Sequence, residues 1–281
     1  MQTIGRYEIQ SELGEGATAA VFLAYDPHTR RQVAIKVLPY GRADDPLFTH
    51  LFRREAETIA ALSHPAIAPV YDFGWHGEQL YMVMRYLPGG SLLDRLRAGA
   101  ILPEQLNSLI QRVAGALDEA HGRDIIHRDV KPANILYDLE SQAYLADFGL
   151  AKLARHSSSF TRELVMGTPH YMSPEHIRGE TLDGRADLYA LGVVLFECLT
   201  RRLPYPYKDP VQAARAALSD PIPSVHSHRP GLPAYSDTIL QKALAKNREE
   251  RYQTAVALAA DVDLAITRRW HLRALGEQPT G

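Results

Sequence analysis

Short runs of β-branched and aromatic residues alternate with polar ones along the N-terminal part of the chain. Such alternation predicts β-strands, and the runs lie at 7–13, 20–25, 32–38, 67–73 and 80–87. The charged, Ala-rich segment 46–62 predicts a helix, which ends before the breaker sequence Ser-His-Pro at 63–65. This part of the chain is therefore predicted to be an antiparallel sheet that carries one helix.

Helical periodicity replaces the alternation after the Pro-Gly-Gly sequence at 88–90. Apolar residues then recur at the spacing of one helix face, which is the stripe that a helix turns toward a core. The stripe comprises Leu106, Leu109, Ile110, Val113, Leu117 and Ala120. Further helices are predicted over 185–200, 210–218, 236–246 and 254–268.

The two patterns predict an α+β fold with two lobes, a small antiparallel β lobe with one helix and a larger α-helical lobe. A chain of 281 residues exceeds what one hydrophobic core accommodates comfortably, which also favours two lobes. We expect the small lobe at 1–87, the large lobe at 88–270 and a tail at 271–281. Because small ligands often bind at domain interfaces, a binding cleft is expected between the lobes.

Composition excludes some classes of function. The formal net charge is −2, from 31 basic and 33 acidic residues, so nothing indicates a nucleic-acid-binding surface. The single cysteine, Cys198, excludes an intrachain disulfide and lies in the apolar run 188–199, which predicts a buried structural thiol. No signal peptide and no membrane span are predicted. We expect a cytoplasmic location, with the cytoplasmic domain of a longer membrane-anchored protein as the alternative.

A Gly-rich segment, LGEGATAAV at 13–21, lies between the first two predicted strands. Glycines let a hairpin backbone approach phosphate oxygens and direct N–H groups at them, although most Gly-rich hairpins are only hairpins. Ala19 stands at the third glycine of a GxGxxG pattern, and the Gly-Lys-Ser/Thr sequence of a Walker A loop is missing. By itself this segment is a weak sign of phosphate binding.

Lys36 lies among apolar residues on the third predicted strand, on the same face as Ala34. That face is expected to line the cleft, and an inward ammonium needs a partner because its desolvation is costly. The helix at 46–62 offers Glu55 and Glu57. We predict a pair with Glu55, because Ile59 one turn later then shares its helix face.

The sequence HRDVKPAN at 127–134 is far more specific, because it places a carboxylate, a lysine and a carboxamide in one loop. Asp129 can accept the proton of a substrate hydroxyl, and Lys131 can offset charge on a transferring phosphoryl group. Asn134 offers a neutral oxygen to a metal ion. Asp147, in Asp-Phe-Gly, follows another short strand and can converge with Asn134 on Mg²⁺.

In order and spacing, these motifs resemble those of the protein Ser/Thr kinase superfamily over about residues 7–268. The wording HRDVKPAN…DFGLAK…GTPHYMSPE is especially similar to its bacterial, eukaryotic-like branch. The resemblance implies a bilobal protein-kinase-like fold and transfer of the γ-phosphate of ATP to Ser or Thr hydroxyls of proteins. The implied cofactors are ATP and Mg²⁺, with Mn²⁺ as a substitute.

The resemblance also assigns roles to residues. Lys36 would hold the α/β-phosphates and pair with Glu55, Asp129 would be the catalytic base, and Asn134 and Asp147 would bind Mg²⁺. In the nucleotide site, Met84 would be the gatekeeper, and Arg85, Tyr86 and Leu87 would meet adenine, with backbone groups of Arg85 and Leu87 hydrogen-bonded to it. The other nucleotide contacts implied are Leu13, Gly14, Glu15, Gly16, Val21, Ala34 and Leu136.

Several further features follow from the same resemblance. Arg85 replaces the commoner Glu, with little consequence expected because the adenine contact there is through the backbone. Glu175 would pair with Arg251 in the large lobe. A column of side chains would link the lobes and be anchored on Asp187; its members are Ile59, Val70, His127 and Phe148.

The resemblance also implies the type of substrate and its control. Lys131 is the residue that Ser/Thr kinases carry two positions after the base, and Thr168 would hydrogen-bond toward Asp129 and Lys131; both favour Ser or Thr over Tyr as the acceptor. The segment between Gly149 and Thr168 is interpreted as an activation loop, phosphorylated by a second copy in a transient dimer and ordered by Arg128. Its candidate phosphorylation sites are Ser157, Ser158, Ser159 and Thr161.

Two alternative functions remain open from the sequence. The first is a pseudokinase that binds nucleotide and signals by shape alone, although every polar group that phosphoryl transfer needs is present. The second is a small-molecule kinase of the aminoglycoside or choline type, which typically carries HGD in place of the HRD found here at 127–129. The expected partners of the favoured function are protein substrates with Ser or Thr.

Overall fold

The computed structural model describes residues 2–16, 19–38, 46–99, 101–148, 169–232 and 235–274. Five of the predicted site residues lie outside these ranges: Ser157, Ser158, Ser159, Thr161 and Thr168.

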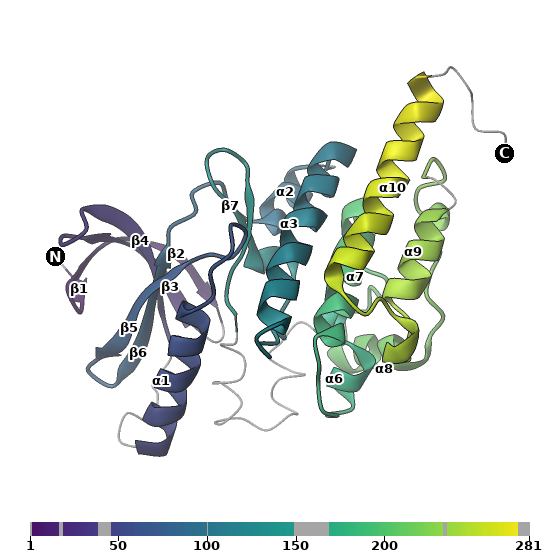
Figure 1. The fold of residues 1–281 in the computed structure, drawn as a ribbon. Coiled ribbons are helices and arrows are strands. Elements are labelled where there is room, and N and C mark those ends of the chain that lie inside the picture. The colour runs from purple at the N-terminus through teal and green to yellow at the C-terminus, as the bar shows by residue number, and fades with distance from the viewer. Residues whose placement is uncertain are drawn as a thin grey trace.

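A six-stranded antiparallel sheet forms one end of the molecule (Figure 1). Its strand order is β1-β2-β3-β4-β6-β5. The strands are β1 (Thr3–Ile4), β2 (Tyr7–Gly16), β3 (Ala19–Asp26), β4 (Arg31–Val37), β5 (Val70–His76) and β6 (Gln79–Arg85), and the helix α1 (Pro46–Ala60) follows β4.

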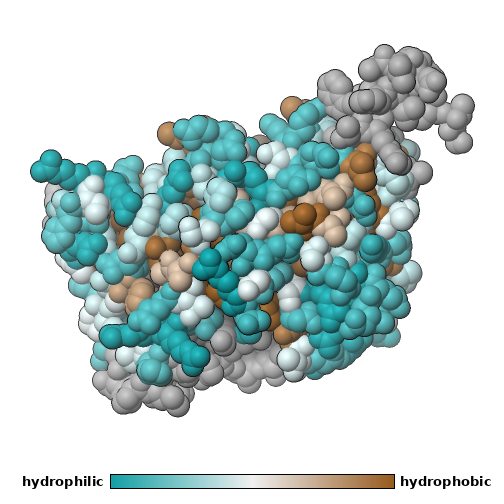
Figure 2. Space-filling view, in the orientation of Figure 1, coloured by the Kyte–Doolittle hydropathy of each residue, from teal (hydrophilic) through white to brown (hydrophobic). Residues whose placement is uncertain are grey.

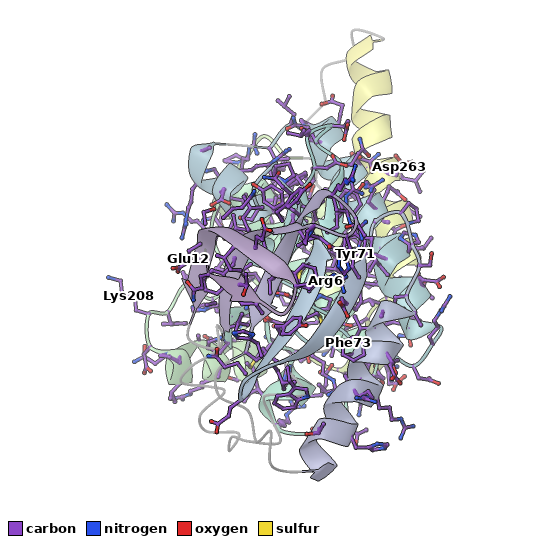
Figure 3. All side chains as sticks on the ribbon, turned by 90° about the vertical axis from the view of Figure 1, so that its left-hand side faces the viewer. Arg6, Glu12, Tyr71, Phe73, Lys208 and Asp263 are labelled. Atoms are coloured by element: carbon purple, nitrogen blue, oxygen red, sulfur yellow. The ribbon has the colours of Figure 1, made fainter. Side chains whose placement is uncertain are left out.

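The central strand β4 buries both of its faces. Val33 and Ile35 belong to a core on the outer side of the sheet, whereas Ala34 packs with Ala56 of α1 on the other side. Because side chains alternate along a strand, Lys36 shares the α1 side with Ala34. Arg6, which Figure 3 labels, pairs with Asp26 and Asp72.

Helices form the other end of the molecule, where α3 and α10 pack side by side (Figure 1). The predicted stripe on α3 is confirmed, because all six of its residues are buried in the main core. Helix α7 lies in the same core and contains the buried Cys198, whose thiol pKa is raised by burial. The helices are α2 (Leu92–Ala98), α3 (Pro103–His121), α6 (Pro174–Ile177), α7 (Arg185–Thr200), α8 (Pro210–Ser219), α9 (Tyr235–Ala243) and α10 (Ala255–Ala274).

A two-stranded ribbon, β7 (Ile135–Tyr137) and β8 (Ala143–Leu145), lies between the sheet and the helices. The strand expected at 67–73 is wrong in its first part, which contacts this ribbon and does not join the sheet. Ile67 forms a bridge with Leu145, and Ala68 N–H donates to the Leu145 carbonyl at 2.9 Å. Strand β5 begins only after Pro69, which has no N–H to donate. The ribbon thus connects the two halves of the fold.

The α+β, bilobal fold class is confirmed, while the exact lobe boundary stays a prediction. Helix α10 continues to Ala274, four residues into the predicted tail at 271–281. No helix of the described ranges is long and apolar enough to cross a membrane. The face shown in Figure 2 is mainly hydrophilic, with hydrophobic residues in small scattered groups, as is usual for a protein surface.

Candidate active site

The segment HRDVKPAN is held by a buried carboxylate on α7. Asp187 accepts the backbone N–H groups of His127 and Arg128, each at 2.8 Å, and the Nε2 of His121 lies 2.8 Å from its Oδ2. Burial alone would raise the pKa of Asp187, but the hydrogen bond with His121 and the backbone bonds lower it below its ordinary value. The predicted anchor at Asp187 is therefore present and holds the start of the loop.

His127 fixes the loop from inside. Its ring is buried, with Nε2 2.9 Å from the Ala146 carbonyl, and Nδ1 accepts the Asp129 N–H at 3.2 Å. The ring also packs against Phe148, with centroids 4.5 Å apart. Ile59 and Phe148 lie in the main core, with Val70 packed against it. The contact between His127 and Phe148 is therefore present, and the stacking of Ile59 and Val70 onto them stays a prediction.

Two non-glycine residues at the site have a left-handed backbone, Arg128 with φ 69° and Asp147 with φ 66°. Such conformations cost about 1 kcal/mol or more each and persist where the surroundings hold them. Arg128 is held by the Asp187 bond, and Asp147 by its side-chain contact with Lys36.

Asp129, Lys131 and Asn134 form one hydrogen-bonded cluster. Lys131 Nζ lies 2.8 Å from Asp129 Oδ2. Asn134 Nδ2 donates to Asp129 Oδ2 at 2.9 Å and to the Asp129 carbonyl at 2.8 Å. The short helix at Pro132–Asn134 turns Asn134 back toward Asp129. The Asp129 side chain is 41% exposed, so it remains accessible from solvent.

Lys36 reaches from β4 to the end of the ribbon, where its Nζ lies 2.7 Å from Asp147 Oδ2. Both side chains are partly buried, 14% and 23% exposed. The contact confirms that Lys36 points away from the outer face of the sheet and toward Asp147. The pairing of Lys36 with Glu55 stays a prediction.

A Mg²⁺ ion fits the residues that would hold it. The two N–H bonds of Asn134 go to Asp129, and within the described ranges its amide oxygen accepts no hydrogen bond, which leaves that oxygen for a cation. Asp147 supplies a carboxylate. Those ranges hold no group of three or more His, Cys, Asp or Glu suited to a metal. Two protein ligands are what Mg²⁺ takes when phosphates and water complete its shell.

The residues predicted around the purine come from the two halves of the fold. Val21, Ala34 and Met84 share an apolar cluster, and Ala34 faces Met84 across the β4–β6 ladder. Leu87 and Leu136 lie together in a second cluster. Tyr86 packs against the first cluster, and Leu13 is exposed at 44%.

The predicted pair Glu175–Arg251 is confirmed. Two bonds of 2.6 and 2.7 Å join the guanidinium to the carboxylate, and both side chains are buried. Burial would raise the pKa of Glu175, but the Arg251 bonds lower it below its ordinary value.

Sequence reasoning missed two contributors to the site. His121 completes the Asp187 anchor, and a histidine at the end of an amphipathic helix gives no sign of that role. Gly89 lies where a Cβ would be 2.4 Å from the Asp138 carbonyl, so the chain can approach the ribbon only with glycine there. The Pro-Gly-Gly sequence at 88–90 is the signal in the sequence for this approach.

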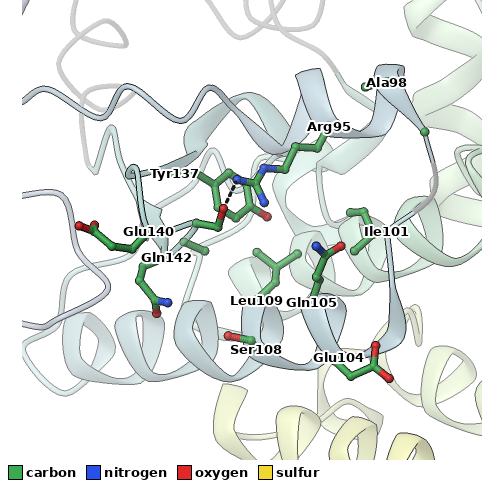
Figure 4. Close-up of a pocket in the computed structure, with 13 residues that line it drawn as sticks. Arg95, Ala98, Ile101, Glu104, Gln105, Ser108, Leu109, Tyr137, Glu140 and Gln142 are labelled. Carbon is green, nitrogen blue, oxygen red and sulfur yellow. Dashed lines mark hydrogen bonds between the residues drawn. The ribbon is translucent and has the colours of Figure 1, made fainter.

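A cavity of about 610 Å³ lies between α2, α3 and the β7–β8 turn (Figure 4). Its lining includes Arg95, Leu109 and Tyr137, and none of the predicted site residues lines it.

Comparison with known proteins agrees with this geometry. Residues 7–262 match the family described as protein kinase domain. The chain is 42% identical to serine/threonine-protein kinase PknB of Mycobacterium leprae over 264 residues, which cover 92% of this chain and 42% of that protein. It is 38% identical to serine/threonine-protein kinase PrkC of Bacillus subtilis, over 93% of this chain and 41% of that protein. The chain thus spans about two-fifths of the length of these relatives.

The fold is also similar to that of solved kinase domains. The kinase domain of Mycobacterium tuberculosis PknI superposes with a TM-score of 0.78 at 30% identity, covering 95% of this chain and 98% of that one. A crystal structure of its C20A variant gives 0.76 at 31% identity, over 94% and 97% of the two chains.

Proposed function

This chain belongs to the protein kinase family, and we propose that it transfers the γ-phosphate of ATP to Ser or Thr hydroxyls of proteins. The observation that carries the proposal is the cluster of Asp129, Lys131 and Asn134, with Asp147 held by Lys36 beside it. A carboxylate, two ammonium groups and an amide oxygen are the groups that position a hydroxyl and balance phosphate charge. The bacterial Ser/Thr kinase relatives support the same activity.

Phosphoryl transfer is catalysed mainly by positioning and electrostatics. Asp129 orients the acceptor hydroxyl and takes its proton, while Asn134 holds one oxygen of that carboxylate in place. Lys131, 2.8 Å from Asp129, offsets charge on the transferring group. Lys36 binds the α/β-phosphates.

Asn134 and Asp147 would hold Mg²⁺ or Mn²⁺, which neutralises charge on the phosphates when bound. The adenine would lie between the cluster of Val21, Ala34 and Met84 and the cluster of Leu87 and Leu136. The backbone N–H of Leu87 donates no hydrogen bond within the described ranges, which suits an adenine acceptor. The glycine-rich segment 13–16 would cover the phosphates.

The experiment is phosphate transfer from γ-labelled ATP to a general protein substrate in the presence of Mg²⁺. We expect phosphoserine and phosphothreonine in the hydrolysed product, and no phosphotyrosine. Asp129→Asn should keep ADP affinity within about twofold and lose transfer by about 10²–10⁴-fold, the usual contribution of a general base. A wild-type protein that binds ATP without transferring phosphate would show instead a nucleotide-binding scaffold.

Autophosphorylation by a second copy is the proposed mode of control, with phosphate at Ser157, Ser158, Ser159 or Thr161 pairing with Arg128. Mass spectrometry after incubation with ATP should find phosphate in 157–161. Asp129→Asn protein mixed with active wild type should gain the same phosphate if transfer occurs in trans. A fully active but unmodified protein contradicts this control.

A further inference from the structure

Arg85 connects the end of β6 to the β7–β8 ribbon through its side chain. Its Nη1 donates to Tyr144 Oη at 3.0 Å, and its Nη2 lies 3.7 Å from Asp138 Oδ2. The guanidinium carbon is 4.8 Å from the centre of the Tyr144 ring, close enough for attraction between a cation and the ring face. Tyr144 Oη in turn donates to Asp138 Oδ2 at 2.9 Å. Arg85, Tyr144 and Asp138 therefore form a closed triangle of side chains.

Asp138 is the fixed corner of this triangle. Its side chain is buried and accepts the Gln142 N–H at 2.8 Å, within the turn that joins β7 to β8. Burial alone would raise the pKa of Asp138, but the bonds from Gln142 and Tyr144 and the charge of Arg85 lower it, so the group is an anion at neutral pH. A buried anion of this kind is stable only with its partners in place.

Tyr144 is also held from the helical side. The Arg112 guanidinium lies 5.2 Å from the centre of the same ring, and Arg112 itself is fixed by bonds to the Ala143 and Pro65 carbonyls. The Tyr144 side chain belongs to the apolar cluster that contains Leu87 and Leu136, two of the residues proposed to contact adenine. Arg85 therefore acts on a ring that is also held by Arg112 and that packs among the residues proposed to contact adenine.

A second attachment lies just beyond this part of the chain. Gly89 N–H donates to the Tyr137 carbonyl at 2.8 Å, and Tyr137 N–H donates to the Gly90 carbonyl at 2.9 Å. The backbone bonds fix the chain after Leu87, and the Arg85 side chain fixes it before. Leu87 thus lies between two attachments to the same ribbon.

We propose that Arg85 is a positioning residue for the nucleotide: through Tyr144 and Asp138 it holds the segment 85–87 at the distance from the ribbon that adenine requires. The inference rests on the proposed function and extends it, because a contact made by the backbone alone would leave the side chain at 85 without a role. The triangle is separate from Asp129 and Lys131. Its loss should therefore weaken nucleotide binding without slowing phosphate transfer.

The test compares Arg85→Met, which keeps the aliphatic stem, with Tyr144→Phe, which removes only the bridging hydroxyl. We expect each to raise the KM for ATP about threefold to tenfold, as for loss of a partly exposed charged hydrogen bond, and to leave kcat within about twofold. Arg85→Lys keeps a cation near Asp138 and should recover part of the affinity. The double variant should bind ATP no more weakly than the weaker-binding of the two single variants, because both substitutions act through one network.

Calorimetric titration locates the defect. Since the defect lies at the adenine end, the Kd values of adenosine and of ADP should rise by the same factor. A defect at the phosphate end would weaken ADP alone. The matched control is Arg95→Met. The Arg95 guanidinium carbon lies 3.4 Å from the centre of the Tyr137 ring (Figure 4), and the side chain donates a hydrogen bond to Ser141. Arg95 thus attaches α2 to the same ribbon, away from 85–87. This variant should keep wild-type affinity.

The outcomes separate the two proposals. If Arg85→Met and Tyr144→Phe lower the melting temperature but keep wild-type Kd values for adenosine and ADP, the triangle is only structural and the positioning role is wrong. If the wild type binds ADP but phosphorylates no protein, the proposed function is wrong, and the calorimetric comparison still decides the role of Arg85.

Discussion

Two ion pairs of nearly equal length have opposite surroundings. Glu175–Arg251 joins at 2.6 and 2.7 Å and is buried, whereas Lys36–Asp147 joins at 2.7 Å and is partly exposed. Arg251 also donates to the Ala245 and Lys246 carbonyls, so its hydrogen bonds are satisfied by the fold itself. Lys36 and Asp147 have capacity left for other partners. A short distance alone therefore does not distinguish a structural pair from a functional one. Burial and the remaining capacity for hydrogen bonds do.

The largest expected effect comes from breaking the buried pair. Arg251→Met leaves the Glu175 carboxylate buried without its guanidinium, and we expect a loss of about 3–5 kcal/mol in the free energy of unfolding. Urea denaturation measures this loss. Replacement of both residues by Met should recover much of the stability, because no charge then stays buried. A single variant as stable as the wild type would contradict the structural role.

Breaking the partly exposed pair, Lys36–Asp147, should affect activity much more than stability. Lys36→Met should change the free energy of unfolding by less than about 1 kcal/mol, since a pair open to solvent contributes little. It should lower kcat/KM for phosphate transfer about 10²–10³-fold, the usual effect of removing one preorganised cationic or hydrogen-bonding group. Unfolding curves and initial rates on the same sample separate the two. A large loss of stability with near-normal activity would reverse the assignment.

Acid titration sharpens the comparison further. The pKa of Glu175 lies below its ordinary value of 4.5, so its pair adds stability above that pH and loses it as the pH falls toward the lower folded pKa. Glu175→Gln removes this contribution, and its stability should fall less steeply below pH 4.5 than that of the wild type. The pKa of Asp187 is also lowered, so part of the dependence of stability on pH remains in this variant. Denaturation midpoints at several pH values measure the difference.

The smallest effect is expected at the surface. Glu180 lies 3.5 Å from Arg178 and 3.8 Å from Arg248, and its side chain is 42% exposed. Glu180→Gln should change the free energy of unfolding by at most about 0.5 kcal/mol and leave phosphate transfer unaltered. A loss comparable to that of Arg251→Met would show that burial does not govern these pairs.

Local pattern was sufficient for most elements. The predicted helix at 185–200 coincides with α7, because a continuous apolar run of this length leaves few alternatives. The errors occur where distant groups compete for the backbone. The helix expected at 236–246 ends at Ala243, and the carbonyls of Ala245 and Lys246 accept from Arg251 instead.

The sequence by itself determined the chemistry that we propose for this protein, because Asp129, Lys131 and Asn134 lie in one short loop whose spacing permits few other uses. Only the tertiary structure decided how that loop is held and which side chains connect the two halves of the fold. Asp187 on α7 accepts a backbone N–H of the loop and is itself bonded to His121 on α3, and Arg85 meets Tyr144 from a strand 59 positions away. Contacts at such separations depend on packing that no local pattern contains.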